Sequence, residues 1–130
     1  MPVTKGIKQL VAEAEEKIVT LTPEQALSRQ QEGTALIIDI RDIRERKREG
    51  FITDAFHAPR GMLEFWIDPA SPYHKETLAT EQTLVLHCAS GWRSALSAVS
   101  LLEMGLENVA HIGGGLGAWK KGDLPIEKLD

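Results

Sequence analysis

A run of apolar, mostly β-branched residues from Ala35 to Ile40, broken only by Asp39, most constrains the fold. Such a run does not alternate between polar and apolar residues, so it predicts a strand covered on both faces, as in a parallel sheet. A second β-rich run, Thr83 to His87, ends at Cys88 and is followed by an Ala/Leu-rich segment, Ala95 to Met104, that predicts a buried helix.

The rest of the chain continues this alternation of strands and helices. Apolar residues recur at helical spacing within Thr4–Lys17, which predicts an amphipathic helix. Thr22-Pro23-Glu24-Gln25 has the residues of a capping box with proline at the first helical position. The remaining expected strands are 18–21, 54–58 and 108–112, and the remaining expected helices are 22–31, 41–49, 62–67 and 116–121, the helix 41–49 being charged and solvated.

These patterns predict an α/β fold with a mostly parallel sheet. A length of 130 residues fits one domain. We expect residues 1–17 to form an N-terminal amphipathic helix packed on a domain made by residues 18–130.

The composition excludes several classes of function. A net charge of −4 gives no general attraction to nucleic acid or to an anionic membrane. A single cysteine excludes an internal disulfide and a cysteine-rich metal cluster, and the four histidines show no metal-ligand spacing. Residues 1–20 lack the apolar core of a signal peptide or membrane span. Since a free thiol fares best in a reducing compartment, we expect a cytoplasmic protein with no metal and no cofactor.

Cys88 is the candidate nucleophile, because it lies where a strand ends and a short polar loop leads into a helix. This geometry directs backbone N–H groups and the positive end of the helix dipole at one point, which lowers a thiol pKa. Gly91 permits a tight turn. Arg93 and Ser94 stand where a helix start would place an anion-binding guanidinium and an N-cap hydroxyl.

Two other motifs have competing interpretations. Gly113–Ala118 formally matches a dinucleotide-binding fingerprint, but the chain ends before the acidic residue that such a site requires. We therefore expect these glycines to form a tight turn that lets the last helix pack closely. His87 should point away from Cys88 on the same strand, which makes it a poor candidate for a contacting base.

The spacing of Cys88 and Arg93 also suggests a cysteine-dependent phosphatase. Those enzymes place five residues between cysteine and arginine, whereas this chain has four. A smaller ring of N–H groups favours a smaller target, such as a single transferable sulfur. A phosphatase remains an alternative.

Four pieces of the chain, taken in this order, form a specific pattern: Ile38-Asp39-Ile40-Arg41-Asp42, Gly50-Phe51-Ile52 with Ala55, Cys88-Ala89-Ser90-Gly91-Trp92-Arg93-Ser94, and Gly113-Gly114-Gly115 through Ala118-Trp119 to Pro125. Through these pieces, the span from about Val19 to Leu124 resembles a single-domain rhodanese, a family of sulfurtransferases. In two places the chain departs from the family: Phe51 replaces a histidine and Thr53-Asp54 replaces Pro-Gly.

The resemblance implies a five-stranded, mostly parallel sheet flanked by helices on both faces. It also implies that Cys88 takes a sulfane sulfur from a small donor such as thiosulfate, forms a persulfide and passes the sulfur to a thiophilic acceptor, cyanide or a thiol. An alternative is a persulfide carrier or sensor that hands sulfur to a protein partner. The residues expected to bind substrate are Ala89, Ser90, Gly91, Trp92, Arg93 and Ser94. Arg60 is a candidate for a second contact with the donor, and the alternative is a plain surface arginine.

Two uses of Arg93 remain open at this point: steering of anionic donors, or bracing of the loop through a carboxylate. Trp92 is expected at the loop tip, where it would shield the persulfide or dock a partner. Asp39 and Arg41 are expected to form an ion pair that supports the loop, and Trp66 and Trp119 to lie in the core.

Overall fold

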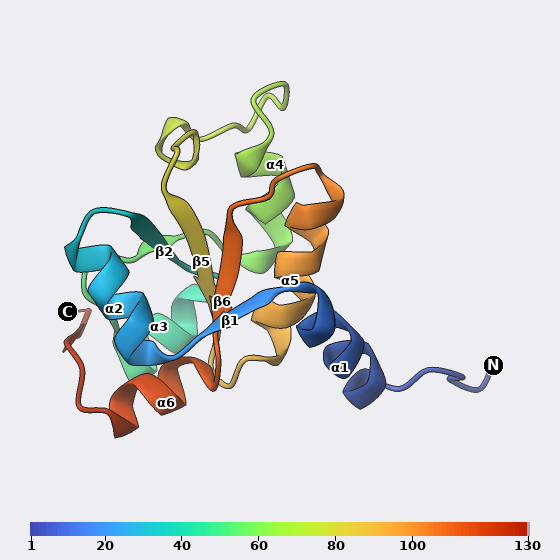
Figure 1. Ribbon diagram of the computed structural model, residues 1–130, viewed down its shortest axis with the longest axis horizontal. Coiled ribbons are helices and arrows are strands. Elements are labelled where there is room, and N and C mark those ends of the chain that lie inside the picture. The colour runs from blue at the N-terminus through green and yellow to red at the C-terminus, as the bar shows by residue number, and fades with distance from the viewer. Residues whose placement is uncertain (130) are drawn as a thin grey trace.

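The computed structural model describes residues 1–129 and is built on one parallel sheet (Figure 1). Its strand order is β1-β6-β5-β2-β4, and every neighbouring pair is parallel. A separate antiparallel ribbon pairs β3 with β7. The strands are β1 (Val19–Leu21), β2 (Ala35–Asp39), β3 (Phe51–Ile52), β4 (Phe56–His57), β5 (Thr83–His87), β6 (Val109–Ile112) and β7 (Ile126–Glu127).

Helices cover both faces of the sheet, as expected. Figure 1 shows α2 and α6 on one side and α4 and α5 on the other, with α1 beside α5. The helices are α1 (Ile7–Lys17), α2 (Pro23–Gln31), α3 (Ile43–Glu49), α4 (Leu63–Ile67), α5 (Trp92–Glu103) and α6 (Gly115–Lys121), with short 3-10 turns at Arg60–Met62 and Glu76–Leu78.

The two central strands, β2 and β5, are buried on both faces. Ile37 and Val85 face one cluster, which contains Trp119 of α6. Ile38 and Leu86 face the other cluster, which includes residues of α4 and α5. The apolar run that predicted a doubly covered strand therefore lies where two cores meet. Trp66, also expected in the core, is partly buried against the second cluster.

The N-terminal helix α1 packs on α5 through Val11, Ala14 and Ala95. It begins at Ile7 rather than Thr4, because Gly6 is in an extended conformation and acts as the N-cap without a side-chain bond. None of the helices within residues 1–129 is long and apolar enough to cross a membrane.

The charged segment after β2 differs from the solvated helix expected over 41–49. The helix α3 starts only at Ile43, and Asp42 caps it by accepting a hydrogen bond from the backbone N–H of Arg44 at 2.7 Å. Arg41 lies before the helix and is 1% exposed, while Arg46 within it is 7% exposed. The alternating charges predicted a solvated helix. Arg41 and Arg46 are buried instead, because both guanidinium groups pair with the buried carboxylate of Asp39 at the end of β2.

Candidate active site

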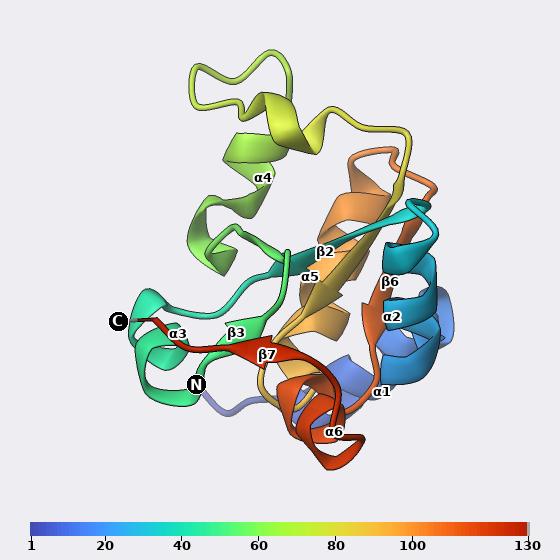
Figure 2. The ribbon, with the colours of Figure 1, turned by 90° about the vertical axis from the view of Figure 1, so that its left-hand side faces the viewer.

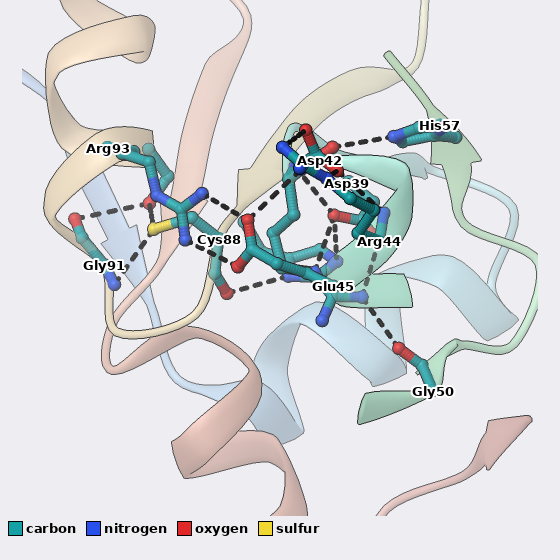
Figure 3. A network of polar contacts seen from close by, with 12 residues as sticks. Asp39, Asp42, Arg44, Glu45, Gly50, His57, Cys88, Gly91 and Arg93 are labelled. Atoms are coloured by element: carbon teal, nitrogen blue, oxygen red, sulfur yellow. Dashed lines mark hydrogen bonds and ion pairs between the residues drawn. The ribbon is translucent and has the colours of Figure 1, made fainter. Parts of the chain in front are cut away.

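Cys88 lies directly after β5, at the carboxyl end of the parallel sheet, where ligands bind in folds of this class. The chain turns sharply over Ala89–Gly91 and enters α5 at Trp92 (Figure 3). Gly91 makes this turn possible because its φ of 103° lies in the left-handed region. A Cβ at Gly91 would also approach the backbone nitrogen of Gly114 to 3.2 Å.

The helix start corrects one expectation. Gly91, not Ser94, is the N-cap of α5, so Trp92, Arg93 and Ser94 form its first turn instead of the loop. The left-handed turn at Gly91 lets the helix begin earlier than the apolar pattern suggested. The Ser94 side chain is therefore free of capping and turns inward, where it is 0% exposed.

The Cys88 sulfur is held by donors on the loop and the helix start. The Gly91 N–H donates to Sγ at 3.1 Å, and the Ser94 hydroxyl lies 3.6 Å from Sγ. Burial would raise the pKa of the thiol, but hydrogen bonds from the backbone and hydroxyl of Ser94 and from the amides of Gly91 and Ser90 outweigh it and hold that pKa below its usual value. Cys88 is nevertheless 1% exposed, which is more enclosed than a reactive cysteine was expected to be.

The start of α6 docks on the same loop. The Leu116 N–H donates to the Cys88 carbonyl at 2.9 Å, and the Gly117 N–H donates to the Ala89 carbonyl at 3.0 Å. This approach needs glycine at position 115, because a Cβ there would lie 2.5 Å from the Cys88 carbonyl oxygen. The glycines after β6 therefore serve close packing, as the sequence suggested, and fix the loop from below.

Arg93 is engaged by a carboxylate. Its two terminal nitrogens donate to the two oxygens of Glu45 at 2.8 and 3.0 Å, a bidentate pair that links α5 to α3 (Figure 3). The hydrogen bond from Arg93 lowers the pKa of Glu45, and the same bond raises the pKa of Arg93. Of the two uses weighed for Arg93, this geometry favours bracing of the loop.

A buried charge cluster lies beneath the loop. Arg41 donates to Asp39 through Nε at 2.9 Å and Nη2 at 2.8 Å, and to the Gly50 carbonyl at 2.8 Å. The Arg46 guanidinium lies 3.5 Å from Asp39, and the Nδ1–H of His87 donates to the Cys88 carbonyl at 3.1 Å. The expected Asp39–Arg41 ion pair is thus present and ties the end of β2 to the end of α3.

The remaining predicted residues lie on the surface around the loop. Ala89, Ser90 and Trp92 are exposed, Trp92 by 45%. Arg60 is exposed as well, and its backbone N–H donates to the Ile40 carbonyl at 3.0 Å. Arg60 therefore lies at the carboxyl edge of the sheet, but within the described residues its side chain forms no hydrogen bond or ion pair with the Cys88 loop.

Sequence reasoning missed His111 and Thr20. Nδ1 of His111 lies 2.9 Å from the Ser94 hydroxyl, and Nε2 lies 3.1 Å from the Thr20 hydroxyl. Thr20 lies on β1 and His111 on β6, the two strands on the side of β5 away from β2. The available signal was a histidine inside the otherwise apolar strand Val109–Ile112, which indicates a buried polar contact whose partner only the strand register identifies.

Two known proteins are similar to this chain over most of its length. A solved structure from Rhodopseudomonas palustris, described as a protein of unknown function and possible tyrosine phosphatase, is 47% identical, covers 98% of both chains and has a TM-score of 0.92. The thiosulfate sulfurtransferase GlpE of Haemophilus influenzae strain PittEE is 32% identical over 82% of this chain and 92% of its own.

A third relative is longer than this chain. An uncharacterized protein of Synechocystis is 33% identical over 85% of this chain, a match that covers 56% of that protein's length. The model of the rhodanese-like domain family matches residues 22–122, which include all strands of the five-stranded sheet except β1, the Cys88 loop and the glycine turn after β6. The chain belongs to the rhodanese-like domain family.

Proposed function

We propose that the protein is a sulfurtransferase in which Cys88 carries the transferred sulfur as a persulfide. The relatives support sulfurtransferase activity in the broad sense. The observation that carries the finer proposal is the hydrogen bond from the Gly91 N–H to the Cys88 sulfur at 3.1 Å, next to the Ser94 hydroxyl. Donors aimed at a thiol stabilise its thiolate, and the thiolate is the nucleophile.

The proposed reaction has two displacements at sulfur. The Cys88 thiolate attacks the outer sulfur of thiosulfate, so an S–S bond forms to Cys88 while the bond to sulfite breaks, and sulfite leaves with its electron pair. Cyanide or a thiolate then attacks the outer persulfide sulfur and regenerates the Cys88 thiolate. No net oxidation occurs on the protein, and ping-pong kinetics are expected.

The first turn of α5 supplies the anion cradle. The amides of Trp92, Arg93 and Ser94 open the helix, where N–H groups have no intrahelical acceptor. They are placed to receive the negative charge of a persulfide and the oxygens of a small anionic donor. Thiolate chemistry of this kind fits a reducing compartment, so the proposal places the protein in the cytoplasm.

A persulfide carrier that delivers sulfur to a protein is the second candidate. Trp92 favours it, because this large apolar side chain is 45% exposed beside the loop and offers a docking contact. A carrier predicts slow sulfur transfer to cyanide and much faster transfer to a protein thiol. An enzyme acting on small molecules predicts comparable rates with both.

A phosphatase fits the site less well. Arginine would have to hold phosphate oxygens, but both terminal nitrogens of Arg93 are bound to Glu45. The loop also has one residue fewer between cysteine and arginine than phosphatases have. The description of the R. palustris relative as a possible tyrosine phosphatase makes the direct assay worthwhile: Cys88-dependent release of phosphate from an aryl phosphate would overturn the sulfurtransferase proposal.

Mass spectrometry tests the proposal most directly. Intact protein treated with thiosulfate should gain the mass of one sulfur atom, and cyanide should remove it. Cys88→Ser should gain nothing, and since Cys88 is the sole cysteine the adduct has one possible site. The absence of any adduct with thiosulfate, polysulfide and an organic persulfide would refute the persulfide mechanism.

A further inference from the structure

A chain of polar contacts leads from the Cys88 sulfur to the protein surface. It runs from Sγ to the Ser94 hydroxyl at 3.6 Å, on to Nδ1 of His111 at 2.9 Å, and from Nε2 of the same ring to the Thr20 hydroxyl at 3.1 Å. Cys88, Ser94 and His111 are 1% exposed or less, whereas Thr20 is exposed. The contacts therefore connect a buried thiol with solvent through three side chains.

His111 differs from the other three histidines in what its ring nitrogens face. His57 Nε2 contacts the Arg41 carbonyl at 2.7 Å, His74 Nδ1 the Trp66 carbonyl at 3.0 Å and His87 Nδ1 the Cys88 carbonyl at 3.1 Å. A carbonyl only accepts, so each of those nitrogens carries the ring hydrogen and each tautomer is fixed.

Both nitrogens of His111 face hydroxyl groups, which can either donate or accept. Its two neutral tautomers are therefore both compatible with the contacts. Burial lowers the pKa of His111 while Glu15 on α1 opposes this, so the ring is neutral near pH 7. Its two register partners in the sheet, Thr20 on β1 and Leu86 on β5, carry no charge.

The thiol and the thiolate of Cys88 require opposite directions of hydrogen-bond donation along this series of contacts. When the thiol donates to Ser94, the Ser94 hydroxyl donates to Nδ1 and the ring hydrogen on Nε2 is donated to Thr20. When the thiolate is present, Ser94 donates to the sulfur, Nδ1 carries the hydrogen and donates to Ser94, and Thr20 donates to Nε2. One proton has then moved from the sulfur to solvent at Thr20, and no charge is left on the path.

We propose that Ser94, His111 and Thr20 form a proton relay for Cys88, in which His111 is a positioning residue that exchanges its tautomer as the thiol ionises. The proposal rests on the proposed function in so far as Cys88 acts as a thiolate. It explains how a thiol that is 1% exposed can lose a proton without direct contact with water. It also accounts for donation from the Ser94 hydroxyl to the sulfur. When the His111 Nδ1–H donates to the Ser94 oxygen, the Ser94 hydrogen is free to point at Sγ.

Nitrogen NMR of the histidine rings tests the relay in the unaltered protein. As the pH rises through the ionisation of Cys88, the His111 ring hydrogen should move from Nε2 to Nδ1, while His57, His74 and His87 keep their tautomers. In Cys88→Ser the His111 tautomer should not change over the same pH range. A His111 tautomer that stays constant while Cys88 ionises would overturn the relay.

Substitutions give a second readout, the pKa of Cys88 followed by the ultraviolet absorbance of its thiolate with Cys88→Ser as the blank. Ser94→Ala should raise this pKa by about one unit, since a thiolate loses one hydroxyl donor. His111→Phe should raise it by a smaller amount, because the Ser94 hydroxyl is then shared with the Gly91 carbonyl at 3.3 Å. The double variant should equal Ser94→Ala.

His74→Gln is the matched control, because the His74 ring contacts the Trp66 carbonyl and lies 4.0 Å from the Glu76 carboxylate, away from the Cys88 loop. It should leave the pKa of Cys88 unchanged. A purely structural role for His111 predicts that His111→Phe lowers the melting temperature but leaves that pKa where it was, and this result would refute the proposal. Neither readout uses sulfur transfer, so absence of persulfide formation would refute the proposed function without deciding the relay.

Discussion

Glu45 offers a direct test of how the active-site loop is held. Its carboxylate has two tasks: it binds Arg93 through both oxygens, and Oε1 accepts from the Asp42 N–H at 3.2 Å in a capping box. Glutamine also serves at this capping position, so Glu45→Gln keeps the cap of α3 and one acceptor for Arg93. The substitution therefore removes the charge of the pair and one hydrogen bond.

The expected cost follows from the geometry and exposure of the pair. A hydrogen bond between charged groups contributes about 1.5–3 kcal/mol. The Arg93 and Glu45 side chains are 35% and 20% exposed, so solvent screening reduces this figure. We expect a loss of about 1 kcal/mol in the free energy of unfolding, or about 3–4 °C in melting temperature.

The control is Glu49→Gln on the same helix. Glu49 contacts Arg48 at 3.2 Å and Lys120 at 3.6 Å, and all three side chains are more than a third exposed. It should change stability by about 0.5 kcal/mol or less. The pKa of Glu45 is lowered by Arg93, so its pairing stabilises the protein above about pH 4.3 and is lost as pH falls through the lower folded value. The difference between Glu45→Gln and wild type should vanish in acid.

Sulfur-transfer kinetics decide the use of Arg93. If Arg93 braces the loop, Arg93→Gln and Glu45→Gln should both lower kcat, leave the KM for thiosulfate nearly unchanged, and combine non-additively in the double variant. If Arg93 instead binds the donor, Arg93→Gln should raise KM while Glu45→Gln, which frees the guanidinium, should lower it. Opposite KM shifts would refute the bracing role.

Three further predictions concern the ion pair, the glycine turn and the thiolate. Asp39→Asn should lower the free energy of unfolding in chemical denaturation by about 3–5 kcal/mol, since it leaves Arg41 buried without its charged partner. Burial would raise the pKa of Asp39, but Arg41 holds it below its usual value, so the difference from wild type should fade as pH drops below about 3.9. Gly115→Ala should abolish persulfide formation by driving a Cβ into the Cys88 carbonyl, whereas Gly33→Ala, also at positive φ but in open space, should cost only about 1–2 kcal/mol and keep activity. In assays of kcat/KM against pH, the activity should rise with ionisation of Cys88 at an apparent pKa below about 8.5; a midpoint at or above that value would contradict the hydrogen-bonded thiolate.

The central part of the fold was predictable because its signals are local. The apolar run Ala35–Ile40 required cover on two faces, and the capping residues at Thr22 fixed the start of α2. The break between strand and helix at Cys88 likewise depends on neighbouring residues. Local pattern and tertiary packing agree in these segments, so reading either one leads to the same structure.

Other features depend on partners that are distant in sequence. The ribbon β3–β7 pairs Phe51 with Glu127, and no local pattern joins two strands of two residues (Figure 2). The Asp39–Arg41 ion pair is predicted from the sequence, but its burial is not. The charged neighbours of Arg41 favour a solvated helix, whereas its guanidinium lies in the interior and also donates to the Gly50 carbonyl. A pattern of charged residues predicts which helix face is exposed to solvent only where the charged side chains have no buried partner.

The site shows the same limit in its chemistry. A cysteine 1% exposed would be judged inert by exposure alone, since burial raises a thiol pKa. The number of hydrogen-bond donors directed at the sulfur reverses that judgement. One of these donors, Ser94, contacts His111. His111 in turn contacts Thr20, which lies 91 positions away from it in sequence. A buried thiol surrounded by donors can be more acidic than an exposed thiol in water, because fixed dipoles replace solvent without having to reorient. Reactivity in this fold should therefore follow the donors around the sulfur rather than its exposed area, and substitutions that remove donors should impair Cys88 more than substitutions that open the loop to solvent.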